Sequence, residues 1–194
     1  MADPPEGKKF NSLQDLAKAS GVPSEPVRSR GGFRPPGNPR RDEGRGDQDT
    51  SGFMHEVWPG YLKDGYFDSG GNLKPEYVRR KEVMPVVEKL GAAKMTSSQL
   101  RRFFQHCRAI ESLLKAKRST WEKERASFMK LDVAAEDALG KRERKIPRLF
   151  HDFIKQNVAA VKTEEDFLEG FLPHFEALVG FGSDVFNRNE RSRQ

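Results

Sequence analysis

Cysteine and long apolar runs are nearly absent from the sequence. The 194 residues include a single cysteine, Cys107, which excludes a disulfide framework and a cysteine-rich zinc module. No segment approaches the roughly eighteen consecutive apolar residues that a membrane-spanning helix needs. The first residues, MADPPEGKK, lack the basic-then-apolar pattern of a secretory signal. We therefore expect a cytoplasmic protein without a membrane partner.

Patterns that carry catalysis are missing as well. Adjacent residues on a helix diverge by about 100°, so His106 and Cys107 cannot serve as base and nucleophile. The glycines of GGFRPPGNP are not followed by the strand and helix of a phosphate-binding loop. No two histidines have metal-ligand spacing beside a carboxylate or cysteine; the four are His55, His106, His151 and His174. The sequence predicts no catalytic residue, no metal and no cofactor.

Residues 1–52 are expected to form a disordered extension rich in proline, glycine and arginine. The first fifty residues hold 7 of the 12 prolines and 7 of the 17 glycines, and they have too few apolar side chains to offset the entropy of ordering. A short amphipathic segment at 10–20 interrupts this composition. Its apolar residues recur at helical spacing, which leaves two interpretations open: a transient helix, or a docking peptide for a groove on a partner.

Residues 53–187 are predicted to fold as an all-α domain, a bundle of four to five helices, followed by a flexible basic tail at 188–194. The apolar residues of this part recur every three or four positions, and no run of alternating β-branched residues competes with that pattern. Helices with one apolar face bury that face most readily against one another.

The first two long helices have recognisable starts. Pro75 suits the first position of a helix that we expect to end at Gly91, with a bend at Pro85. Thr96 and Gln99 have the spacing of a capping box, which predicts the start of the second helix. The apolar positions of this second helix continue through Trp121, so we predict one long helix that reaches about Met129.

The remaining helices are shorter or less regular in pattern. A segment at 131–139 is predicted to end at Gly140, and Pro147 is expected to open the next helix. Thr163 is the expected cap of the closing helix, and Pro173 should disturb that helix locally. The closing helix is rich in phenylalanine, which must be buried in a core or an interface.

The positive charge is concentrated in one part of the chain. The net charge of the whole sequence is +6, whereas residues 101–148 carry +7 and residues 149–194 carry −3. Three cations of the second helix recur every seven residues and therefore share a face: Arg101, Arg108 and Lys115. Over about 21 Å they could contact successive phosphates of a nucleic acid. A solvated basic face with pairs such as Glu111–Lys115 is the alternative interpretation.

Further basic residues could lengthen this cationic face. Lys117 and Arg118 follow it directly, and the cluster KRERK at 141–145 comes next in the sequence. No base-reading motif accompanies them, so any contact with a nucleic acid should follow the backbone and its shape.

The segment MTSSQLRRFF, Met95 to Phe104, resembles the signature of the small subunit of type III-A CRISPR effector complexes, the Csm small-subunit family. Three other segments are similar to that family in the same order: residues 65–78, the helix after Pro147, and residues 171–181. The resemblance extends over roughly residues 61–182.

This resemblance implies a non-catalytic, RNA-binding subunit of an antiviral ribonucleoprotein. Several copies would stack along the duplex of guide RNA and target RNA, between the backbone subunits and the large multidomain subunit, while other subunits cleave. Arg101 occupies the basic position of the motif, Arg108 and Lys115 come from the helical-face argument, and Lys141 and Arg142 match loosely. The candidate RNA-binding residues are Arg101, Arg102, Arg108, Lys115, Arg118, Lys141 and Arg142.

A second function stays open from the residues alone. The chain could be a helical adaptor that binds protein and not nucleic acid. It would use the phenylalanine-rich closing helix and the amphipathic segment at 10–20 as its docking surfaces.

Overall fold

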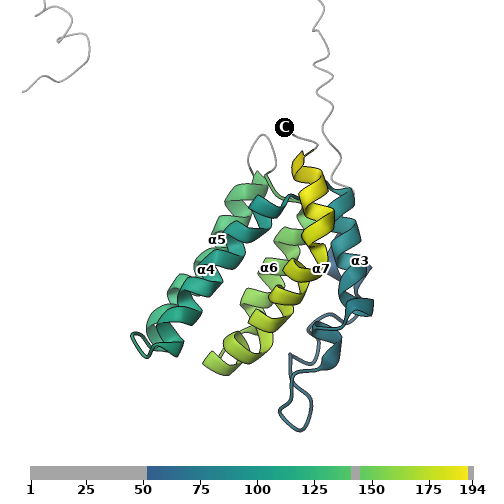
Figure 1. Cartoon of the computed structure of the whole chain (residues 1–194). Coiled ribbons are helices and arrows are strands. Elements are labelled where there is room, and N and C mark those ends of the chain that lie inside the picture. The colour runs from purple at the N-terminus through teal and green to yellow at the C-terminus, as the bar shows by residue number, and fades with distance from the viewer. Residues whose placement is uncertain (1–51, 141–144, 192–194) are drawn as a thin grey trace, which may run out of the picture. The chain divides into compact units, whose positions relative to one another are not determined.

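The computed structural model describes residues 52–140 and 145–191 (Figure 1). The helices are α2 (Met54–Val57), α3 (Arg80–Ala92), α4 (Ser97–Lys115), α5 (Trp121–Gly140), α6 (Arg148–Ala160) and α7 (Leu172–Arg191), with a 3-10 turn η1 (Pro75–Tyr77) and a π-helical segment η2 (Asp166–Phe171). Over these two ranges an isolated bridge between Phe67 and Leu73 is the sole β-type pairing. The predicted all-α bundle is confirmed. The expected extension up to residue 51, with its segment at 10–20, lies outside the described residues.

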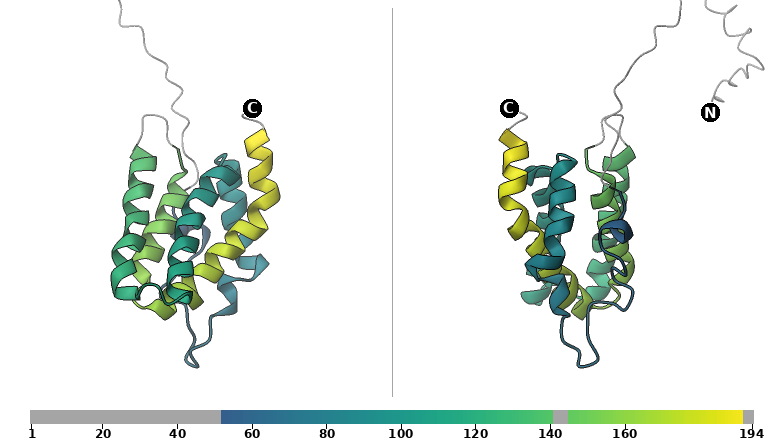
Figure 2. Two further views of the ribbon diagram at one scale, coloured as in Figure 1. Left: turned by 60° about the vertical axis from the view of Figure 1, so that its left-hand side comes forward. Right: turned by 90° about the vertical axis from the view of Figure 1, so that its right-hand side faces the viewer.

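The five longer helices lie side by side as a bundle (Figures 1 and 2). α7 packs against α3 and α4, and α5 packs against α6 and α4. The connection between α4 and α5 lies at one end of the bundle, so these two helices run in opposite directions (Figure 1). No helix in the described part of the chain is long and apolar enough to cross a membrane.

The predicted first helix from Pro75 is wrong at its start. Pro75 opens only the short turn η1, and Arg79 is extended before α3 begins. A continuous helix would need the Tyr77 carbonyl to accept the N–H of residue 81. That carbonyl instead accepts a hydrogen bond of 2.6 Å from Nδ1 of His174 in α7. A tertiary contact therefore breaks the helix that local propensity favours.

Gly91 was expected to end this helix, but it lies inside α3. The helix continues to Ala92 and closes through Lys94, which has a φ of +58°. A Cβ atom at position 91 would lie 2.3 Å from Cγ1 of Val185. The glycine therefore allows α7 to approach α3 closely, and the chain reversal is left to Lys94.

The single long helix predicted to reach Met129 is also wrong, because α4 ends at Lys115 and α5 starts at Trp121. Lys117 has a φ of +53°. Its N–H donates to the Leu114 carbonyl, and the N–H of Arg118 donates to the Leu113 carbonyl, both at 2.9 Å. This is the Schellman motif, which usually places glycine at the left-handed position. Because Lys117 and not glycine occupies that position, the sequence does not indicate that the helix ends here.

The later helices follow the sequence predictions more closely. The segment at 131–139 is the second half of α5, which ends at Gly140 as expected. Pro147 is the N-cap of α6. Oγ1 of Thr163 accepts the Asp166 N–H at 3.0 Å, and the Asp166 carboxylate accepts the Thr163 N–H at 2.9 Å. Thr163 therefore caps the closing helical segment, as predicted.

Pro173 has the local effect that the sequence predicts. The segment before it, η2, has π-helical hydrogen bonding, which is consistent with a proline nitrogen that cannot donate within a regular α-helix. Beyond it α7 continues to Arg191. Phe186 is buried near its end, and the side chain of Asn189 donates to the carbonyls of Gly91 and Met95. Residues 188–191 therefore belong to the bundle rather than to the expected tail, and 192–194 lie outside the described residues.

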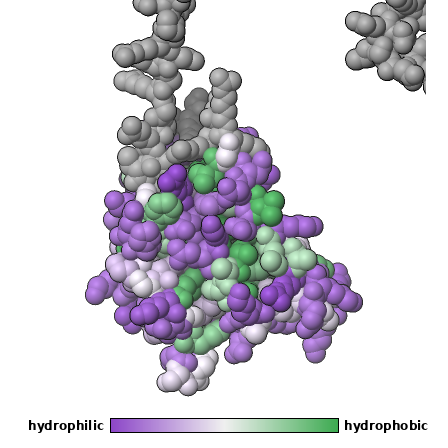
Figure 3. Space-filling model, turned by 180° about the vertical axis from the view of Figure 1, so that it is seen from behind, coloured by the Kyte–Doolittle hydropathy of each residue, from purple (hydrophilic) through white to green (hydrophobic). Residues whose placement is uncertain are grey.

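Aromatic side chains from the closing segment fill the core. Phe167, Phe171 and Phe175 have no exposed surface, and their rings form a chain with centroid separations of 6.2 and 5.5 Å. These phenylalanines are therefore not available as the docking surface that a protein adaptor would use. The most exposed of the large apolar side chains in the described part of the chain are on α5, where Met129 is 52% and Val133 70% exposed. Hydrophobic residues interrupt a mostly hydrophilic surface in the view of Figure 3.

A buried polar network ties the segment before α3 to α6 and α7. The Tyr61 hydroxyl accepts from Nδ2 of Asn157 at 2.7 Å and lies 2.8 Å from Nε2 of His174. Because Nδ1 of His174 contacts a carbonyl, Nδ1 carries the ring proton and Nε2 accepts the Tyr61 hydroxyl proton. The Tyr66 hydroxyl donates to Oδ1 of Asn157 at 2.7 Å. The network is complete only when His174 is neutral.

We expect the stability of the fold to depend on the protonation of His174. Burial lowers the pKa of this histidine to about 4 from its ordinary value of 6.5. Between those two pH values the unfolded chain binds a proton that the folded chain excludes, so stability falls as the pH falls. The free energy of unfolding should drop by about 3 kcal/mol across this interval because of His174.

Urea denaturation at pH 7 and at pH 4.5 tests this prediction. The wild type should lose more stability than His174→Gln between these pH values, whereas His55→Asn, at an exposed position, should behave as the wild type does. Equal losses in wild type and His174→Gln would show that His174 is not the group responsible.

Candidate nucleic-acid interface

The candidate interface is built on α4, whose start is fixed by the capping box that the sequence predicts. Oγ1 of Thr96 accepts the Gln99 N–H at 3.4 Å, and Oε1 of Gln99 accepts the Thr96 N–H at 2.8 Å. Both donors would otherwise be unsatisfied at a helix N-terminus. This local interaction sets which residue begins α4 and thus which side chains face the core.

The apolar stripe of α4 is buried, so its cations point away from the core. The buried apolar residues of this helix are Leu100, Phe103, Cys107, Ile110 and Leu114. Four basic residues of the same helix are exposed, and we call them the α4 cations: Arg101, Arg102, Arg108 and Lys115. From Arg101 to Lys115 they extend over about 21 Å of helix. Such a row can contact successive phosphates of one strand.

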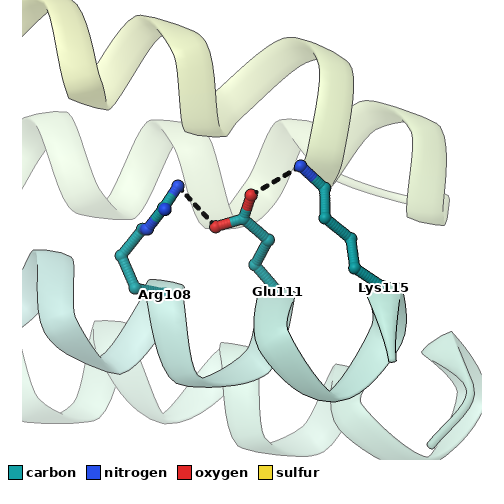
Figure 4. A network of polar contacts seen from close by, with 3 residues as sticks. All are labelled: Arg108, Glu111 and Lys115. Carbon is teal, nitrogen blue, oxygen red and sulfur yellow. Dashed lines mark ion pairs between the residues drawn. The ribbon is translucent and has the colours of Figure 1, made fainter. Parts of the chain in front are cut away.

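Two of the α4 cations converge on one carboxylate (Figure 4). Nη1 of Arg108 lies 2.6 Å from Oε2 of Glu111, and Nζ of Lys115 lies 2.8 Å from Oε1. The side chains of Arg108 and Lys115 are 52% and 63% exposed, whereas that of Glu111 is only 9% exposed. Glu111 raises the pKa of the Lys115 ammonium by its hydrogen bond and its charge, and Glu169 adds to the effect.

This pair of cations lies on the side of α4 that adjoins α7. The guanidinium of Arg108 lies 6.0 Å from the centroid of the Phe104 ring. That ring in turn packs edge-to-face on Phe175 of α7, with a centroid separation of 5.3 Å. Arg108 and Lys115 therefore border the contact between α4 and α7.

Arg101 and Arg102 differ from that pair in their surroundings. Both are exposed in the first turns of α4, and neither forms an ion pair with any residue that the structure describes. They point about 100° apart around the helix axis. The charge of this end of α4 is therefore less compensated than the charge around Glu111.

Lys145, the one described residue of the basic cluster at 141–145, does not lie next to Arg118. Arg118 is exposed in the connection between α4 and α5. α5 then runs back over its 20 residues, about 30 Å. The side chain of Gln99 donates to the Lys145 carbonyl, so Lys145 lies beside the first turn of α4. Lys145 is therefore near the N-terminal end of the α4 row, and its part in the cationic face stays a prediction. Lys141 and Arg142 lie outside the described residues.

Cys107 and His106, which the sequence analysis considered as a nucleophile and a base, both contact backbone carbonyls of the bundle. Cys107 is fully buried, its thiol donates to the Phe103 carbonyl at 3.3 Å, and burial raises the pKa of that thiol to about 12. A ring nitrogen of His106 contacts the Ser127 carbonyl at 2.9 Å. Among residues 52–140 and 145–191, no group of three or more side chains is arranged as metal ligands.

Two features of the interface did not follow from the sequence. The first is Arg108 as a second partner of Glu111, although the spacing of three residues permits that pair; the Glu111–Lys115 pair named from the sequence is confirmed. The second is Lys145 beside the start of α4, which no local pattern indicates because it depends on the length of α5. The first lies within α4 alone, whereas the second arises only once the helices are placed against one another.

The comparisons with known proteins assign the family. The family model described as Csm2 Type III-A matches residues 79–184, which include α3 to α6, η2 and most of α7. The matched region contains the MTSSQLRRFF segment and every α4 cation. No match was found among the curated proteins or among the solved structures. The chain therefore belongs to the Csm2 family of small subunits of type III-A CRISPR complexes.

Proposed function

We propose that this chain is a non-catalytic RNA-binding subunit that lies along the guide RNA–target RNA duplex of a cytoplasmic, antiviral type III-A complex. The observation that carries the proposal is the set of α4 cations. They extend from a helix whose core contacts do not use them. A row of cations on a rigid helix contacts phosphates without reading bases.

The proposed partners follow from this arrangement and from the family. Guide RNA and target RNA would contact the α4 cations and Arg118, with Lys145 and the neighbouring Lys141 and Arg142 as further candidates. The backbone subunits, the large multidomain subunit and further copies of the chain would hold it in the complex. The chain would bind and stack, and other subunits would perform the cleavage.

Electrophoretic mobility of a labelled, unstructured RNA tests the proposal. The full chain should shift the RNA at low salt, and the affinity should fall steeply at moderate salt because phosphate contacts release counterions. An uncharged nucleic-acid analogue with the same bases and no phosphates is the matched probe, and it should not bind. The absence of any RNA shift at every salt concentration would favour the adaptor alternative instead.

A further inference from the structure

Glu111 is a carboxylate at a position where an apolar residue would pack. Its side chain is 9% exposed, and it lies on the buried stripe of α4 with Cys107 and Leu114. Burial of a carboxylate costs free energy that pairing offsets only in good geometry, and an apolar side chain avoids that cost. Packing alone therefore does not explain Glu111.

Glu111 forms ion pairs with two exposed cations. It contacts Arg108 at 2.6 Å and Lys115 at 2.8 Å (Figure 4). A second carboxylate, Glu169 of η2, also acts electrostatically on Lys115. A phosphate that approaches this part of α4 meets two cations together with two carboxylates. Arg101, in contrast, forms no ion pair with a described residue.

We propose that Glu111 is a specificity-determining residue that weakens the attraction of Arg108 and Lys115 for an RNA backbone. The carboxylate competes with phosphates for both cations, so these two bind RNA strongly only when other contacts already hold the strand. Weakened single contacts disfavour arbitrary RNA more than RNA fixed at several points, because specificity is a difference of affinities. This inference rests on the proposed RNA-binding function.

The substitution Glu111→Gln removes the charge and keeps the size of the side chain. We expect the affinity of the full chain for an unstructured RNA at low salt to rise about five- to tenfold, because one negative charge near the phosphates is removed. The dependence of log K on log salt should steepen by about 0.7 for each further phosphate that the freed cations neutralise.

Two further variants keep this test decisive. Glu88→Gln makes the same change of net charge at an exposed position of α3, and its affinity should stay within about twofold of the wild type. Glu111→Leu supplies the apolar side chain that the buried position favours, so it remains informative if the glutamine variant does not fold. Circular dichroism establishes that each variant is helical before binding is measured.

The outcomes separate this inference from the proposed function. Tighter binding by both Glu111 variants, and not by Glu88→Gln, supports the inference. If the wild type binds RNA and the Glu111 variants bind equally or more weakly, the inference is overturned while the proposed function stands. If only the Glu111 variants bind, RNA binding by the natural chain is overturned, and the inference with it. If no protein binds at any salt concentration, both proposals are overturned.

Discussion

Replacing Arg101, Arg108 and Lys115 by Ala, together with Glu111→Gln, should weaken RNA binding by roughly thirty- to a hundredfold at low salt. The three alanines remove the row of phosphate-binding cations along α4. The glutamine is needed because Glu111 is nearly buried and pairs with two of the replaced cations. Without this substitution the nearly buried carboxylate would lose both of its partners and destabilise the fold, and the binding result could not be interpreted.

Fluorescence anisotropy at several salt concentrations measures this weakening. The salt dependence, as log K against log salt, should become shallower by about 0.7 for each phosphate that Arg101, Arg108 and Lys115 neutralise in the wild type. The control is Lys63→Ala with Lys81→Ala, which lowers the net charge by the same two units at exposed positions outside α4. Equal weakening in both variants would mean that overall charge, rather than α4, determines the affinity.

The largest expected effect on stability is that of Phe153→Ala, with a loss of about 4 kcal/mol in the free energy of unfolding. Phe153 has no exposed surface. The centroid of its ring lies 5.4 Å from that of His174 and 5.5 Å from that of Phe175, both in α7. On its own helix, α6, the ring stacks on Phe150 with a centroid separation of 5.9 Å. Alanine at position 153 would therefore leave a cavity between α6 and α7.

Urea denaturation of the purified chain at pH 7 measures this effect. Phe53→Ala removes the same side chain at a position that is 36% exposed, and it should cost about 1 kcal/mol or less. A loss for Phe153→Ala that is no larger than that of the control would show that the aromatic core does not stabilise the bundle as the packing indicates.

Helix boundaries set by a capping side chain were predictable in this chain, whereas boundaries set by a left-handed lysine were not. The starts of α4 and of the closing segment depend on side chains that cap their own helix, Thr96 and Thr163, so the sequence contains the signal. The ends of α3 and α4 use Lys94 and Lys117 in the left-handed conformation, where glycine is the usual residue. A lysine at such a position cannot be distinguished from any other surface lysine before the structure is known.

Tertiary contacts account for the other differences. The Tyr77 carbonyl is bound to His174, which lies 97 residues further along the chain, and no local pattern predicts that contact. The shared face of Arg101, Arg108 and Lys115 could be predicted from their spacing of seven residues, because it depends on helix geometry alone. The degree to which Glu111 neutralises Arg108 and Lys115 could not be predicted, because it depends on the burial of the Glu111 side chain.

The central claim, that the chain binds RNA within a type III-A complex, is tested most directly by its co-purification with RNA. The tagged full chain is isolated at low salt from cells that contain such a complex, and the bound RNA is sequenced. We predict enrichment of guide RNAs with a repeat-derived end sequence, together with the other subunits. Recovery of partner proteins without any guide RNA would contradict the claim.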